Sequence, residues 1–220
     1  MTVEQICKFL NEFKGSNDFE EPSEEGLAET FEKYIIHNFS KEINNLNDYL
    51  DIPIIYQDAV ISAFNKIDLG NNSVYIERML DFLEKLSEKF YINLNSENDC
   101  IKSSLISLIR FMDDYLLKID NLYYDKVLKK IKYILIKILE NVKEEDVVCS
   151  DYITSALNTI RGNCYIALVK YSLKVAKVKF SNEEIKWEND VKELFTHNLD
   201  KEKETSLNVF GRAMGSTKYR

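Results

Sequence analysis

Apolar residues recur every three to four positions along almost the whole chain, which is the period of an amphipathic α-helix. Polar or glycine-containing breaks divide this pattern into about ten segments. The loops between the segments are mostly short, which favours antiparallel packing of neighbouring helices. The sequence therefore predicts an all-α fold.

Residues that commonly cap helices precede several of these segments. Thr2 stands three positions before Gln5, which is the spacing of a capping box. Ser23 precedes two glutamates, which suit the positive first turn of a helix. We expect Ser40 to cap a short third helix and Pro53 to lie in the first turn of a fourth.

The later part of the chain carries longer apolar stripes. Ser73 predicts the start of one helix, and two equally long stripes follow over residues 101–119 and 124–142. A stripe from Ser150 to Val178 predicts the longest helix, in a central position. Further helix starts are predicted at Ser181 and near residue 207.

About ten paired helices fit either a closed bundle or a right-handed stack of helical hairpins. No fixed residue pattern recurs at about 34 or 40 residues, so a regular repeat family is unsupported. We expect an irregular α-solenoid, a HEAT- or TPR-like stack of antiparallel helix pairs that forms a single domain over residues 1–220. Because the apolar face of residues 207–214 has no later helix to pack on, we expect a fragment of a longer protein.

Composition narrows the alternatives. Six glycines and two prolines in 220 residues provide too few turns for a β-sandwich or barrel. The four cysteines lack a CxxC pair, so we expect them to be reduced and buried, without a zinc site. The chain has no apolar run of about 18 residues and no signal-peptide pattern, so we expect a cytoplasmic protein without a membrane partner.

The charge is unevenly distributed. The chain has 37 acidic and 29 basic residues, a net charge of −8, which argues against a general nucleic-acid-binding role. Residues 1–110 contain 20 acidic and 10 basic residues, and this acidity favours a basic protein partner. We interpret the lysine-rich stretches 129–132 and 170–179 as solvated helix faces. A nucleic-acid-binding role for the Lys-rich C-terminal half is the alternative.

Motifs that carry chemistry are scarce. The chain contains no phosphate-binding loop, dinucleotide fingerprint, serine-hydrolase elbow or HExxH motif. The adjacent carboxylates Asp113 and Asp114 diverge by about 100° on a helix and do not face each other. We therefore assign no catalytic, cofactor-binding or metal-ligating residue and predict a protein that is not an enzyme. An enzyme that uses His37 or His197, the two histidines of the chain, is a third hypothesis.

Residues 158–163 form the most unusual segment, because Gly162 falls inside a predicted helix, where it costs about 1 kcal/mol relative to alanine. A glycine there lets a neighbouring helix approach closely. Arg161 can form a bidentate pair with a carboxylate on that neighbour. We interpret Arg161 and Gly162 as a structural helix-packing seam.

Two segments carry a family resemblance. Residues 22–28 resemble a PSxEGL signature. Residues 156–162, followed by 167–171, resemble the pattern A-x-N-S-V-R-G…A-L…Y, with Thr159 and Ile160 in place of serine and valine. Both are similar to the C-terminal helical, HEAT-like region of large bacterial multidomain ATP-binding proteins that resemble signal-transducing (STAND-type) NTPases.

The resemblance implies a helical sensor that follows an NTPase, in a class of proteins with suspected roles in defence against phage. Any ATPase activity would then lie outside this chain. The first functional hypothesis is a non-enzymatic sensor or scaffold module that recognises a protein, with no cofactor. The surface that binds the partner and the oligomeric state are left open by the sequence.

Overall fold

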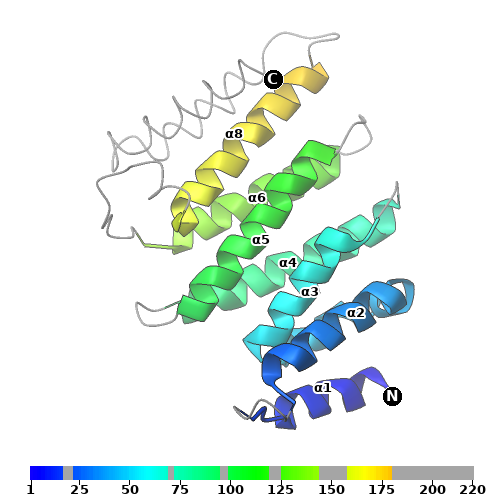
Figure 1. Ribbon diagram of the computed structural model, residues 1–220. Helices are drawn as coiled ribbons and strands as arrows, with labels where there is room; N and C mark the ends of the chain where they lie inside the picture. Colours follow the sequence, from blue (N-terminus) through cyan, green and yellow to red (C-terminus); the bar gives the residue numbers. More distant parts are fainter. Residues whose placement is uncertain (17–21, 69–71, 95–98, 119–124, 144–157, 180–220) are drawn as a thin grey trace. The chain divides into compact units, whose positions relative to one another are not determined.

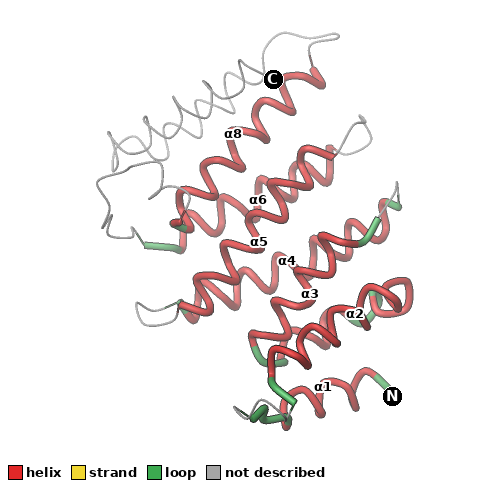
Figure 2. Tube along the Cα trace, viewed as in Figure 1, coloured by secondary structure: helices red, strands yellow, loops and turns green. Residues whose placement is uncertain are grey.

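A computed structural model describes residues 1–16, 22–68, 72–94, 99–118, 125–143 and 158–179 (Figure 1). These residues form seven α-helices and one 3-10 helix, and the described part of the chain contains no β-strand (Figure 2). The prediction of an all-α fold is confirmed. In chain order the elements are α1 (Val3–Glu12), α2 (Glu24–Glu42), η1 (Leu46–Asp51), α3 (Ile54–Lys66), α4 (Ser73–Asn93), α5 (Asp99–Lys118), α6 (Asp125–Asn141) and α8 (Ile160–Lys179).

Local capping signals account for the first two helix starts. The Gln5 amide donates to the Thr2 hydroxyl at 3.3 Å, and the Thr2 amide donates to the Gln5 side-chain oxygen at 2.9 Å. The predicted capping box is therefore present. The Ser23 hydroxyl accepts a hydrogen bond from the Gly26 amide at 3.0 Å, so the second predicted cap is also confirmed.

The predicted helix start at Ser40 is wrong. Helix α2 continues through Ser40 to Glu42, and its backbone departs from helical geometry at Asn38 (φ −111°, ψ 15°). The Asn38 side chain donates to the Tyr34 carbonyl at 2.9 Å, which satisfies an acceptor at this irregularity. The expected third helix is the shorter element η1, which begins at Leu46.

The stripe expected to run from Ser150 to Val178 is interrupted. Residues 144–157 lie outside the described part of the chain, and Thr159 is a bend directly before α8. The Thr159 hydroxyl accepts from the Gly162 amide at 3.1 Å, as an N-cap does. Gly162 therefore lies in the first turn of α8, where glycine is less costly than in a helix interior. The starts predicted at Ser181 and near residue 207 lie outside the described residues.

The chain divides into two compact units, residues 1–111 and 112–220. In the first unit α2 packs against α3, as Figure 1 shows, and η1 contacts α1 and α4. Aromatic rings make edge-on contacts across this core. The Phe31 ring contacts Tyr49 and Tyr56 at centroid distances of 5.4 and 6.3 Å, and the Phe64 ring contacts Phe39 and Phe82 at 6.1 and 6.0 Å. Core packing is thus the role of these aromatic residues, as the sequence predicts.

In the second unit α6 packs against α8. The fully buried positions of these two helices are mostly aliphatic, and they include Ile131, Ile134, Leu135, Ile138, Ile160, Ala167 and Leu168. Cys164 is buried as expected, but Cys7 in α1 is only half-buried and Cys100 in α5 is exposed, which contradicts the prediction for both residues. The buried stripe of α5 passes through Ile101 and Leu105 and leaves Cys100 on the outer face. Cys149 lies outside the described residues.

None of the helices described here combines the length and the apolar character that crossing a membrane requires.

Candidate functional site

A carboxylate lies fully buried at the end of α2. The Glu42 side chain has no exposed surface, and each of its oxygens accepts a hydrogen bond from a tyrosine. The Tyr34 hydroxyl donates to Oε1 at 2.8 Å, and the Tyr49 hydroxyl donates to Oε2 at 2.6 Å. The Lys41 ammonium lies 4.0 Å from Oε1. Because a buried carboxylate is costly unless it is hydrogen-bonded, the two tyrosines stabilise Glu42. Tyr49, which belongs to η1, also connects that element to α2.

The environment of Glu42 changes the acidity of both tyrosines. Burial, the hydrogen bond to Glu42 and the charge of Glu42 together raise the pKa of Tyr34 to about 12. The same causes, led by burial, raise the pKa of Tyr49 well above its ordinary value. Both phenols therefore keep their protons at neutral pH and act as donors to Glu42.

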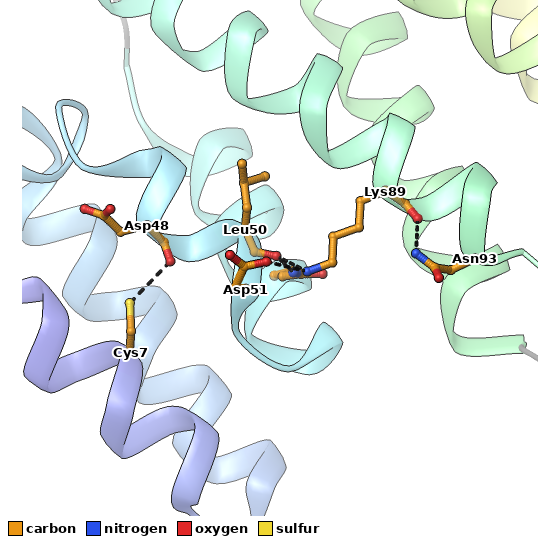
Figure 3. Close-up of polar contacts among 7 residues, drawn as sticks. Cys7, Asp48, Leu50, Asp51, Lys89 and Asn93 are labelled. Carbon is orange, nitrogen blue, oxygen red and sulfur yellow. Dashed lines mark hydrogen bonds and ion pairs between the residues drawn. The ribbon is translucent and has the colours of Figure 1, made fainter.

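Side chains from other helices hold the backbone of η1 (Figure 3). The Lys89 side chain reaches from α4 and donates to the Leu50 carbonyl and to Asp51 Oδ1, the latter at 3.1 Å. The Cys7 thiol of α1 donates to the Asp48 carbonyl at 3.5 Å. A cation beside the carbonyls at a helix C-terminus is favourable. Lys89 therefore stabilises the backbone at the end of η1, and it also pairs with the carboxylate of Asp51.

Two further contacts complete the anchoring of η1. The Gln57 side chain in α3 donates to the Leu50 carbonyl at 2.6 Å. The Lys85 ammonium in α4 donates to the side-chain oxygen of Asn47 at 3.0 Å. Together with Cys7, Lys89 and the bond from Tyr49 to Glu42, these groups tie the six-residue 3-10 helix to α1, α2, α3 and α4.

The anchored element presents carboxylates to solvent. Asp48 is exposed, and the side chain of Asp51 is 93% exposed. We call these two residues the η1 acidic surface. Its carboxylates stand on a backbone that four helices hold in place, which gives a fixed negative feature within the acidic part of the chain.

The surroundings of Cys7 disfavour its thiolate form. Burial raises the pKa of the Cys7 thiol, and the charge of Asp48 raises it further. Because the thiolate is the nucleophilic form of cysteine, Cys7 acts as a hydrogen-bond donor to η1.

The Arg161 side chain extends from α8 to the C-terminal end of α6. Its Nη1 donates to the carbonyls of Leu139 and Val142 at 3.0 and 2.8 Å, and its Nη2 donates to the Tyr165 hydroxyl at 3.2 Å. The guanidinium thus satisfies acceptors that a helix C-terminus leaves open. Gly162 is buried beside it. Arg161 therefore joins α8 to α6, while the carboxylate partner and the packing role of Gly162 remain predictions.

The two adjacent carboxylates of α5, Asp113 and Asp114, lie in different surroundings. The Asp113 side chain is 14% exposed and forms an ion pair with Lys170 of α8, whereas Asp114 is exposed. Burial raises the pKa of Asp113, and Lys170 opposes that shift. Asp113 is therefore part of an ion pair that connects α5 to α8.

His37 is the histidine that falls within the residues that the structure describes. His37 is exposed on α2, and its Nδ1 lies 2.6 Å from the Lys33 carbonyl of the preceding turn. His197 lies outside the described residues. In the described part of the chain, no three His, Cys, Asp or Glu residues are grouped so that they could hold a metal ion.

Sequence reasoning identified Arg161 but missed the anchoring of η1. Cys7 and Asp48 are 41 positions apart, and Lys89 and Leu50 are 39 positions apart. No local spacing connects such residues.

Comparisons of the chain with protein-family models, with curated proteins and with solved structures found no match.

Proposed function

We propose that the chain is a non-enzymatic protein-recognition module whose η1 acidic surface binds a basic partner. The supporting observation is the combination of an anchored backbone with exposed carboxylates at Asp48 and Asp51. A surface that is already fixed before binding loses little conformational entropy when the partner docks. Carboxylates in a fixed arrangement also select for basic groups and against acidic ones.

The proposal extends to the context of the module. The helices form part of an irregular, HEAT-like solenoid of about ten helices in antiparallel pairs. The module serves as a sensor or scaffold within a cytoplasmic bacterial signalling NTPase, of the kind suspected in defence against phage. The resemblance of residues 22–28 and 156–171 supports this context.

Affinity capture with matched baits tests the proposal. Purified wild-type chain and the variant Asp48→Asn/Asp51→Asn are exposed to nuclease-treated bacterial lysate, and retained proteins are quantified by mass spectrometry. Glu29→Gln/Glu88→Gln is the control, because it removes two exposed carboxylates of the same unit outside η1. We expect a basic protein that the wild type and the control retain and the η1 variant loses by at least about tenfold.

Equal loss in both variants would show that general acidity, rather than η1, attracts the retained protein. Retention of an identical set of proteins by all three baits would also contradict the proposal. Circular dichroism of each bait establishes that the substitutions leave the helical content unchanged.

A further inference from the structure

The outer face of α6 combines lysines with an exposed aromatic ring. Residues 125–141 contain five lysines against one aspartate and one glutamate. Lys126, Lys130, Tyr133 and Lys137 recur at intervals of four, three and four residues, which places them on one stripe of the helix. Lys129 borders the same stripe. The stripe is about 16 Å long at the rise of an α-helix.

The burial pattern shows that this stripe faces away from the core. Ile131, Ile134 and Ile138 of α6 are fully buried. By contrast, Lys126 and Lys129 are exposed, Tyr133 is 48% exposed, and Lys130 and Lys137 are half-buried. A large aromatic ring in this position contributes less to the core than the aliphatic residues on the opposite face. The Lys137 ammonium lies 5.8 Å from the centre of the Tyr133 ring and 3.1 Å from Glu140.

We propose that this stripe is a binding surface for single-stranded nucleic acid, separate from the η1 acidic surface. Lysines along a groove or helix attract the phosphate backbone, and an accessible aromatic ring stacks on a base. Single strands fit this arrangement better than a duplex, because their bases are free to stack on Tyr133. The surface is local: it occupies a basic helix within a chain whose net charge is −8.

Fluorescence anisotropy with a labelled 20-nucleotide oligothymidine tests the proposal on the full chain. Contacts from four lysines give a slope of log affinity against log salt of about −3, so raising the salt from 50 to 200 mM should weaken binding about 50-fold. Lys126→Gln/Lys130→Gln should reduce the magnitude of that slope by about 1.4. Tyr133→Ala should weaken binding about 5- to 150-fold with the slope unchanged, whereas Tyr133→Phe should bind like the wild type.

Control variants separate a local site from general electrostatics. Lys8→Gln/Lys33→Gln removes the same charge from exposed positions of the first unit and should leave the affinity unchanged. The proposal is overturned if the oligonucleotide does not bind at 50 mM salt, if Tyr133→Ala binds like the wild type, or if the control weakens binding as much as the α6 variant. Stronger binding of polyglutamate than of the oligonucleotide would likewise overturn it, in favour of an acidic protein ligand.

Discussion

Removing the Tyr49 hydroxyl tests how much its hydrogen bond to the buried carboxylate of Glu42 contributes to stability. In Tyr49→Phe, Oε2 of Glu42 loses a donor at 2.6 Å in a site without solvent exposure. A hydrogen bond to a charged group contributes about 1.5–3 kcal/mol, and an unsatisfied buried acceptor brings the cost to the upper end of that range. We expect Tyr49→Phe to lower the free energy of unfolding by about 2–3 kcal/mol.

The matched change at Tyr34 should cost less. Its hydroxyl donates to the other oxygen of Glu42 at 2.8 Å, but the Tyr34 side chain is only partly buried, so water can replace part of the lost interaction. We expect Tyr34→Phe to cost about 1 kcal/mol. Tyr133→Phe is the control, because Tyr133 is 48% exposed, and it should cost less than about 0.5 kcal/mol.

Urea unfolding followed by circular dichroism measures the change in stability. Because the chain has two compact units, hydrogen exchange of peptides from α2 and η1 is needed to locate the effect. The reasoning is refuted if Tyr49→Phe unfolds within about 0.5 kcal/mol of the wild type without faster exchange in η1. It is also refuted if Tyr34→Phe proves the more damaging change.

The same network predicts a dependence on alkaline pH. An unfolded tyrosine loses its proton near pH 10, whereas folding raises the pKa of Tyr34 to about 12 and that of Tyr49 further. The contribution of these pKa shifts to stability is therefore complete below about pH 10 and is lost as the pH rises through the folded pKa values. Urea midpoints at pH 9 and 11 should show a smaller decrease for the double variant Tyr34→Phe/Tyr49→Phe than for the wild type.

Substitutions at Gly15, Arg161 and Lys170 also test local geometry. Gly15→Ala should destabilise the first unit by about 1–3 kcal/mol, because the new Cβ would lie 2.5 Å from the Glu24 amide nitrogen; Gly26→Ala, whose Cβ meets only the Ser23 hydroxyl at 3.5 Å, should be neutral or stabilising in thermal unfolding. Arg161→Met should lower the free energy of unfolding by about 1–3 kcal/mol, because the carbonyls of Leu139 and Val142 lose the guanidinium that donates to them. Hydrogen exchange in the last turn of α6 should become faster in the same variant. Lys170→Met should lower the urea midpoint by leaving Asp113 without its cation, and Lys170→Met combined with Asp113→Leu should recover most of that loss.

The sequence predicts features that short-range chemistry determines. The caps at Thr2 and Ser23 depend on residues three positions away, and the structure confirms both. The same reasoning fails at Ser40, because a serine hydroxyl can either cap a helix or lie inside one. In addition, Glu42 binds Tyr34, which precedes the helix start predicted at Ser40, and Tyr49, which follows it. Local spacing does not distinguish these outcomes.

The candidate site depends on contacts that no spacing rule reveals. A charge count identifies the acidity of the first unit, but it does not distinguish Asp48 and Asp51 from the other carboxylates. Asp48 and Asp51 differ from the other carboxylates because Cys7 and Lys89 hold the backbone of η1, and these two residues lie about 40 positions away along the chain. Arg161 was identified because it adjoins an unusual glycine, yet the carbonyls that it binds follow from the position of α6.

Lys89 allows anchoring and charge to be separated at the η1 acidic surface. Its ammonium donates to the Leu50 carbonyl, which holds the backbone, and also pairs with Asp51, which reduces the negative charge that a partner meets. Lys89→Met therefore makes the surface more negative while it releases the end of η1. If charge alone governed recognition, a basic partner would bind this variant more tightly than the wild type. Because a loosened η1 must be ordered again on binding, we expect weaker binding, together with faster hydrogen exchange in η1. Tighter binding of Lys89→Met in titration calorimetry would show that the anchoring of η1 does not contribute to recognition.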